Sequence, residues 1–179
     1  MSKKVLILSG SPRKNGNSDL LCDAFLKGAT EAGNQTEKIF IHSKKIGFCN
    51  ACYYCKNHAG ECVIKDDMTE ILDKMQEADV IVMASPVYFY SIDAQMKAVI
   101  DRSLARWTNM PDKEFYYILT AAEDSDTVMD CTLECFRGFA SCLRGAKEKG
   151  VIYGKGVYEA GEVRNTGLCE QAYEMGKQV

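Results

Sequence analysis

Polar residues suited to anion binding are concentrated near the amino terminus, in residues 9–18, which we call the phosphate loop. An apolar run, residues 5–8, ends abruptly at Ser9, and helix-type sequence begins at Asp19. A loop between a buried strand and a helix places the unpaired first N–H groups of the helix at the carboxyl end of the strand, where an anion can bind. The loop adds further donors and two turn-permitting glycines: Gly10, Ser11, Arg13, Gly16, Asn17 and Ser18. A phosphate group is the expected ligand, and an ordinary polar loop is the alternative.

Two familiar phosphate-binding patterns do not match this stretch. Its glycines fall at positions 10 and 16, which does not give G-x-G-x-x-G, and Gly16 is followed by Asn17 rather than by the lysine of a P-loop. The sequence therefore disfavours a nucleoside triphosphatase.

A second candidate binding segment is residues 85–91, which we call the aromatic loop. It directly follows the least polar segment of the chain, residues 78–85. Pro86 restricts the turn, and three aromatic rings offer flat apolar surface to a planar heterocycle. The alternative is that these rings cap the core beneath a neighbouring loop.

Four of the nine cysteines lie in residues 43–66, which we call the cysteine loop: Cys49, Cys52, Cys55 and Cys62. A C-x2-C-x2-C run lets three thiolates converge from a compact loop, and a fourth can complete an iron-sulfur site. Zinc fits the spacing less well, because structural zinc usually takes two separated pairs. Reduced or occasionally disulfide-linked thiols are a third interpretation, favoured by a reducing cytosol, and all three stay open. His58 is more simply a solvated loop residue than a further ligand.

Periodicity predicts five strands alternating with five helices. The expected strands are residues 5–8, 36–42, 78–85, 114–122 and 150–157, and the expected helices are 18–32, 67–75, 92–105, 127–149 and 166–177. Asp67 and Glu70 resemble a capping box. Three cysteines of the fourth helix are expected to be buried packing residues: Cys131, Cys135 and Cys142.

This alternation indicates an α/β fold, a three-layer, doubly wound parallel sheet of five strands in one domain, residues 1–179. The economical strand order is the flavodoxin-like 2-1-3-4-5, whose ligand crevice lies between the ends of strands one and three. That order brings the phosphate loop beside the aromatic loop.

The two loops, GSPRKNGNS and SPVYFYS, resemble the phosphate and isoalloxazine loops of the flavodoxin-like NAD(P)H-dependent FMN reductases. The resemblance covers essentially the whole chain. It implies that one group of residues holds the FMN phosphate: Ser11, Arg13, Asn17 and Ser18. It implies that a second group flanks the ring: Pro86, Val87, Tyr88, Phe89 and Tyr90. The third flavin loop would fall at residues 121–126, within the stretch TAAEDSD of residues 120–126, where glycine-rich sequence is common in relatives.

The cysteine loop is similar to that of the iron-sulfur flavoproteins, a branch of the same family. The resemblance implies a [4Fe-4S] cluster on Cys49, Cys52, Cys55 and Cys62. Relatives without a cluster keep similar cysteines, so free thiols and zinc remain alternatives.

Composition narrows the partners of the chain. The formal net charge of the 179 residues is −3 and no extended basic cluster occurs, which argues against nucleic acid. No run approaches the ~20 apolar residues that span a bilayer, and no signal-peptide core is present, so we expect a cytoplasmic protein with no membrane partner.

The expected function is that of an FMN-dependent oxidoreductase that takes hydride from NAD(P)H and passes electrons to a small acceptor such as a flavin or quinone. FMN carries the chemistry, so no catalytic side chain is assigned. The alternatives are an iron-sulfur flavoprotein electron carrier and a non-enzymatic flavodoxin-like binding module. A homodimer or homotetramer is expected, with Trp107 and part of the cysteine loop in or beside an interface near the open flavin edge.

Overall fold

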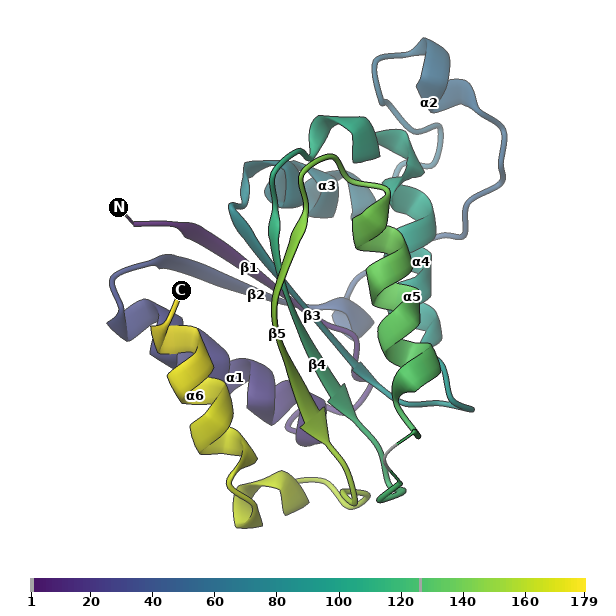
Figure 1. Ribbon diagram of the computed structural model, residues 1–179. Coiled ribbons are helices and arrows are strands. Elements are labelled where there is room, and N and C mark those ends of the chain that lie inside the picture. Colours follow the sequence, from purple (N-terminus) through teal and green to yellow (C-terminus); the bar gives the residue numbers. More distant parts are fainter. Residues whose placement is uncertain (1, 126) are drawn as a thin grey trace.

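The computed structural model describes residues 2–125 and 127–179 and contains one five-stranded parallel sheet (Figure 1). The strands are β1 (Lys4–Ser9), β2 (Gln35–Phe40), β3 (Val80–Pro86), β4 (Glu114–Thr120) and β5 (Lys147–Gly154). Their order is β2-β1-β3-β4-β5, and every neighbouring pair is parallel. The predicted order and the predicted flavodoxin-like fold class are confirmed.

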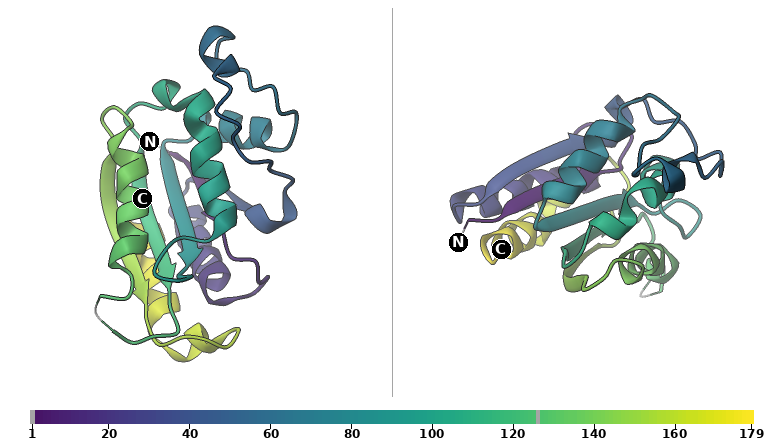
Figure 2. Two further views of the ribbon diagram at one scale, coloured as in Figure 1. Left: turned by 90° about the vertical axis from the view of Figure 1, so that its right-hand side faces the viewer. Right: turned by 90° about the horizontal axis from the view of Figure 1, so that it is seen from above.

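Helices cover both faces of the sheet and make three layers (Figures 1 and 2). On one face lie α1 (Asn17–Glu31) and α6 (Leu168–Lys177), and on the other lie α3 (Met68–Glu77), α4 (Ala94–Arg102) and α5 (Asp130–Ser141). Strand β1 serves both layers, because Leu6 and Leu8 join the core under α3, α4 and α5, whereas Val5 and Ile7 join the core under α1 and α6. This alternation follows from the two-residue period of a strand that is buried on both sides.

Several short helical turns complete the chain: η1 (Ile41–Ser43), α2 (Tyr54–Asn57), η2 (Ser103–Ala105), η3 (Trp107–Asn109) and η4 (Glu162–Asn165). The cysteine loop runs from η1 to α3 and carries α2 away from the body of the domain (Figure 1). Among the described residues, no helix is both long and apolar enough to cross a bilayer.

The predicted boundary between the fourth helix and the fifth strand is wrong by several residues. Helix α5 ends at Ser141 rather than near residue 149, and β5 begins at Lys147 rather than at Gly150. Gly145 makes the turn with φ +73°, and a Cβ there would meet Asp112 Oδ1 at 2.1 Å. The edge strand therefore starts earlier than its apolar residues indicate, because its polar first half pairs with β4 while remaining exposed.

Two local predictions also fail. The side chain of Asp67 does not cap α3; it accepts from the Lys45 N–H (2.7 Å), and Asp66 Oδ1 accepts from the Met68 N–H (3.1 Å) instead. The cysteines of α5 are not buried: Cys131 and Cys142 are exposed and Cys135 is half-buried. The inner face of α5 is occupied by a different stripe: Thr132, Leu133, Phe136, Phe139 and Ala140.

Candidate functional site

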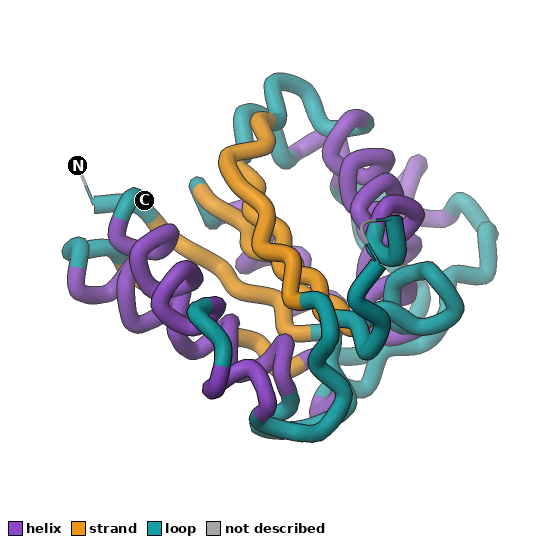
Figure 3. Tube along the Cα trace, turned by 60° about the horizontal axis from the view of Figure 1, so that its bottom comes forward, coloured by secondary structure: helices purple, strands orange, loops and turns teal. Residues whose placement is uncertain are grey.

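Four loops meet at the carboxyl ends of the strands (Figure 3). Their residues border a cavity of about 170 Å³. The phosphate loop follows β1, the aromatic loop continues from β3, and segments after β4 and β5 complete the wall. All four predicted phosphate-binding residues line this cavity, as do three of the five predicted ring-flanking residues: Pro86, Val87 and Tyr88. Phe89 and Tyr90 do not line it; they project from the loop and are exposed.

The amino end of α1 presents backbone N–H groups to this cavity region. The N–H of Leu20 donates to the carbonyl of Gly16 (2.9 Å), so the N–H groups of residues 17–19 precede the first intrahelical bond. Gly16 is the N-cap and provides no side chain to bind them. A Cβ at this position would lie 2.9 Å from the Arg13 carbonyl oxygen and 3.2 Å from Ser11 Oγ, so the close loop packing requires glycine. This helix end is therefore suited to an external anion.

The Asn17 amide connects α1 to the segment between β5 and α6. Its Oδ1 accepts from the N–H groups of Gly161 (3.1 Å) and Val163 (3.2 Å), and its Nδ2 donates to the Glu159 carbonyl (2.9 Å). Three of its bonding positions are thus used within the chain. The side chain of Asn17 acts here as a support for residues 159–163.

The other polar residues of the phosphate loop are also engaged. The hydroxyls of Ser18 and Thr120 lie 2.7 Å apart, and Ser11 Oγ accepts from the Arg13 N–H at 3.2 Å. Arg13 Nη1 donates to the Tyr158 carbonyl (3.0 Å), and its guanidinium carbon lies 5.6 Å from the centre of the Tyr158 ring. The cation of Arg13 is therefore positioned at the cavity wall by Tyr158.

The aromatic loop ends in a tight turn that exposes its rings. The backbone N–H and carbonyl groups of Tyr88 and Ser91 pair reciprocally, at 2.9 and 3.0 Å. Between them, Phe89 (φ 50°) and Tyr90 (φ 60°) both have left-handed backbone conformations. Asparagine and glycine are the residues usually found at such positions in a tight turn. The Phe89 ring is fully exposed. Bulky residues held in a strained, exposed turn are typical of functional segments.

A buried polar pair closes the base of the aromatic loop. Ser85 Oγ accepts from the Asp93 N–H (2.9 Å) and lies 2.7 Å from Asp93 Oδ2, while Asp93 Oδ1 accepts from the Met96 N–H (2.9 Å) and caps α4. Burial raises the pKa of the Asp93 carboxyl. The two ends of the loop are therefore joined inside the core, beside Gly10 of the phosphate loop.

Three residues that were not predicted as site residues from the sequence also line the cavity: Thr120, Val157 and Tyr158. The third loop contributes Ala121 and Ala122, and Asp126 lies outside the described residues. The segment after β5 is held in place by the Val157 N–H, which donates to the Ala121 carbonyl (2.9 Å). Gly154 and Gly156 mark a turn in the sequence, but they do not show which loop the turn would meet.

The four cysteines of the cysteine loop line a second, separate cavity together with Arg102. Cys49 and Cys52 are exposed, and Cys55 and Cys62 are half-buried. In the described part of the chain, no three cysteine, histidine or acidic side chains are gathered closely enough to hold a metal ion. The His58 ring stacks on the Tyr54 ring with ring centres 3.5 Å apart. His58 Nδ1 also forms a hydrogen bond with the backbone carbonyl of Tyr54 (2.9 Å).

Arg102 supports this second cavity from the core side. Its side chain is almost fully buried and forms a two-bond pair with Asp66, from Nη1 to Oδ2 (2.7 Å) and from Nη2 to Oδ1 (3.0 Å). Nη1 also donates to the Gly47 carbonyl (2.8 Å). The buried Nε has no partner within the described residues. An unpartnered buried donor beside four thiols suits an acceptor such as a thiolate or a cluster sulfide.

Residues 3–125 match the model of a protein family described as NADPH-dependent FMN reductase. The chain belongs to this family. The matched residues include the phosphate, cysteine and aromatic loops, and the open amino end of α1 with its unsubstituted Gly16 fits the phosphate of FMN. FMN is therefore the cofactor of this family member.

Curated relatives of this FMN reductase family member include iron-sulfur flavoproteins of archaea. One from Archaeoglobus fulgidus is 46% identical over 101 residues, which are 56% of this chain and 46% of that protein. One from Methanosarcina thermophila is 44% identical over 101 residues, 56% of this chain and 52% of that protein. The matched stretch spans about half the length of these relatives.

Solved structures confirm the fold of this family member. The NAD(P)H:quinone oxidoreductase from Methanothermobacter marburgensis superposes with a TM-score of 0.77 at 16% identity, covering 99% of this chain and 98% of that one. An azoreductase from Bacillus anthracis gives the same TM-score and identity, with 100% of both chains covered. At such identities the likeness concerns the fold alone.

Proposed function

We propose that this protein is an FMN-dependent oxidoreductase that takes hydride from NAD(P)H and passes the electrons to a small acceptor such as a flavin or quinone. The observation that supports this most strongly is the meeting of an open helix end and an exposed aromatic loop around one cavity. When bound, FMN supplies the redox chemistry by accepting two electrons from the nicotinamide and releasing them to the acceptor.

The residues of the chain would bind and orient the cofactor. The N–H groups of residues 17–19, with Ser11 and Arg13, would hold the phosphate, while Pro86, Val87 and Tyr88 would lie against the ring. Neither His42 nor His58 is among the cavity-lining residues, which agrees with a mechanism that needs no side-chain base.

The test is a titration of purified protein with FMN, followed by anaerobic addition of NADPH or NADH and then of a quinone or free flavin. The proposal predicts saturable binding, bleaching of the flavin absorption by the nicotinamide and its return with the acceptor. Protein that takes up no FMN, or bound FMN that neither nicotinamide reduces, would refute it.

A second candidate function, that of an iron-sulfur electron carrier, is favoured by the four thiols and the unpartnered Arg102 Nε around one cavity. Anaerobic reconstitution with iron and sulfide should then give a brown protein with about four irons per chain, as for a [4Fe-4S] cluster. Cys52→Ser should lower the iron content, and Cys169→Ser, outside the cysteine loop, should not. Equal iron content in both variants would exclude the cysteine loop as the site.

We also propose a homodimer or homotetramer, because Tyr88, Phe89 and Tyr90 are exposed and hydride transfer benefits from water exclusion. Trp107 and part of the cysteine loop stay in or beside the proposed interface. Residues 46 and 48 of the cysteine loop share a cavity with Ala94 and Gln95 at the amino end of α4, which the aromatic loop precedes, whereas Trp107, in η3, follows the carboxyl end of α4 (Figure 1). Both ends of α4 would therefore have to lie at or beside the interface if one partner covers them.

Light scattering should give a multiple of the 19.9 kDa chain mass. Phe89→Glu should reduce that mass, whereas Tyr153→Glu, at an exposed ring outside the cavity, should not. An FMN-loaded wild-type monomer would overturn the proposal.

A further inference from the structure

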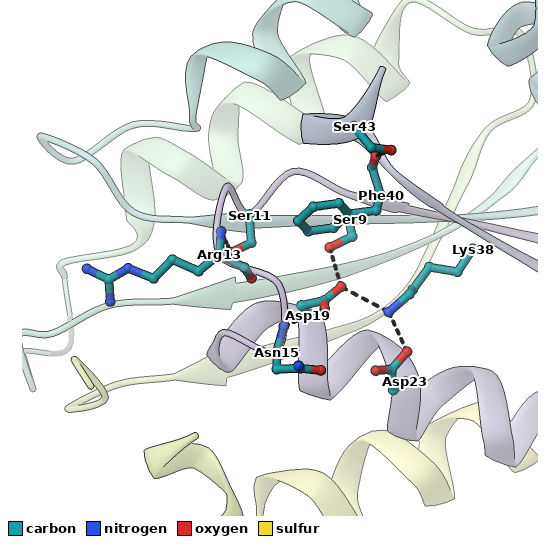
Figure 4. A network of polar contacts seen from close by, with 9 residues as sticks. All are labelled: Ser9, Ser11, Arg13, Asn15, Asp19, Asp23, Lys38, Phe40 and Ser43. Atoms are coloured by element: carbon teal, nitrogen blue, oxygen red, sulfur yellow. Dashed lines mark hydrogen bonds and ion pairs between the residues drawn. The ribbon is translucent and has the colours of Figure 1, made fainter. Parts of the chain in front are cut away.

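A buried carboxylate, Asp19, is hydrogen-bonded to the phosphate loop on the side away from the cavity (Figure 4). Asp19 is 2% exposed and is not among the residues that line the cavity. Its Oδ1 accepts from Ser9 Oγ (2.9 Å) and from Lys38 Nζ (2.9 Å), and its Oδ2 accepts from the Asn15 N–H (3.0 Å). One side chain thus connects the end of β1, the middle of the loop and strand β2.

The bond to Asn15 fixes the turn that leads into α1. Asn15 is left-handed (φ 60°), a conformation that asparagine tolerates better than most residues but that is still uncommon. Asp19 is the third residue of the helix, the position from which a capping-box side chain reaches back toward the preceding backbone. By holding Asn15 in this turn, Asp19 sets where the following N–H groups of residues 17–19 lie.

Lys38 compensates the buried negative charge. Its ammonium lies between Asp19 and Asp23 and bonds both carboxylates (Figure 4). Burial alone would lower the pKa of Lys38, but the hydrogen bonds to Asp23 and Asp19 outweigh burial and raise it. The lysine is therefore charged throughout the physiological range.

We propose that Asp19 and Lys38 form a positioning pair that gives this protein its preference for phosphorylated flavin, by holding the phosphate loop in the conformation that binds the phosphate. This inference rests on the FMN site of the proposed function. The Asp19 side chain acts through Asn15 and the loop backbone rather than by touching the ligand.

If Asp19 acted only through its charge, its removal would change FMN affinity in the opposite direction from a positioning role. A carboxylate beneath a phosphate site repels the ligand, so removing its charge without changing the loop would strengthen FMN binding. A positioning role predicts that Asp19→Asn weakens FMN binding, because the asparagine has one acceptor oxygen where the carboxylate has two. The loss of a charge-assisted hydrogen bond of this kind corresponds to roughly tenfold or more in the dissociation constant.

The test compares FMN with riboflavin, which lacks the phosphate, by fluorescence titration of the full chain. Asp19→Asn and the double variant Asp19→Asn/Lys38→Met should each bind FMN about tenfold more weakly, with the riboflavin constant changed less than about threefold. The double variant removes both charges together, so it leaves no unpaired buried charge to unfold the protein. Asp23→Asn, which removes the other partner of Lys38 and touches no loop residue, is the matched control and should bind FMN like the wild type.

Each other outcome decides against the proposal. Wild-type or tighter FMN binding by Asp19→Asn, or recovery in the double variant, would show that the pair acts only through charge. An equal loss for riboflavin and FMN would show a general structural role. Unmutated protein that binds both flavins equally would refute the phosphate site itself, and this result is obtained before any variant is measured.

Discussion

The phosphate loop of the proposed FMN site and the cysteine loop are built in different ways. In the phosphate loop, Ser11, Asn17 and Ser18 are buried; the Ser11 hydroxyl bonds within the loop, and the Asn17 and Ser18 side chains bond to distant parts of the chain. In the cysteine loop, Cys49 and Cys52 are exposed, and Ala51, Tyr53 and Ala59 are left-handed. The difference indicates that the chain itself organises the proposed FMN site, whereas the cysteine loop is anchored at its base by Arg102 and leaves two of its thiols exposed.

Among the proposed substitutions, removal of Arg102 should lower the stability of the protein most. Arg102→Met leaves the nearly buried Asp66 carboxylate without its cation, and loss of one partner of such a pair costs about 3 kcal/mol or more in unfolding free energy. Urea unfolding measures this cost. Lys97→Met, in the exposed pair Lys97–Asp101, is the control and should change the unfolding free energy by less than about 0.5 kcal/mol. Equal effects would mean that Arg102 does not anchor the cysteine loop.

The same pair should make stability depend on pH in acid. Burial would raise the pKa of Asp66, but hydrogen bonds from Arg102 and from the N–H groups of Gly47 and Met68 outweigh burial and lower it. A carboxyl with a lowered folded-state pKa stabilises the protein above its unfolded value, about 3.9, and this contribution is lost as the pH falls through the folded-state pKa. The stability gap between wild type and Arg102→Met should therefore shrink below about pH 4. A gap that is constant from neutral pH to pH 2 would contradict this role of Asp66.

On the flavin side, Arg13→Ala should weaken FMN binding by roughly 1.5–3 kcal/mol, or about ten- to a hundredfold, through loss of a charge-assisted contact to the phosphate. The neighbouring exposed Lys14 provides the matched control, because Lys14→Ala removes a cation of equal charge outside the cavity wall. Fluorescence titration would distinguish the two variants. Equal losses would mean that only the general positive potential matters.

The smallest effect is expected for the ring platform. Tyr88→Ala should shift the visible spectrum of bound FMN and lower its affinity by about 0.5–1.5 kcal/mol, the usual size of a ring–ring contact. Tyr153 has the same 44% exposure and does not line the cavity, so Tyr153→Ala is the control. A spectrum unchanged by Tyr88→Ala would remove this ring from the flavin site.

The sequence predicted the sheet and the position of the phosphate and aromatic loops because both depend on local patterns. Apolar strands followed by polar loops and amphipathic helices are visible within a window of residues, and the strand order follows from their alternation. The end of α5 was predicted poorly, because the polar first half of edge strand β5 lacks the apolar period of a buried strand.

The remaining features of the site depend on contacts between distant residues. Arg13 meets Tyr158, and Asn17 meets residues 159–163, more than 140 positions away, so no local pattern indicates these contacts. The hydrogen bond between the Asn15 N–H and Asp19 joins residues four positions apart, so it is local. The ion pair between Asp19 and Lys38 forms only because β2 lies beside β1. The exposure of the cysteines in and beside α5 was also not predicted. The helix carries both a row of cysteines and a row of larger apolar residues, and the sequence alone does not show which row faces the core.

A crystal structure of the protein with FMN would test the proposed FMN site better than any other measurement. We expect the phosphate to lie at the amino end of α1, within hydrogen-bond distance of the N–H groups of residues 17–19 and of Arg13, with the ring against Pro86, Val87 and Tyr88. FMN bound elsewhere, or bound here with its phosphate directed away from α1, would contradict it.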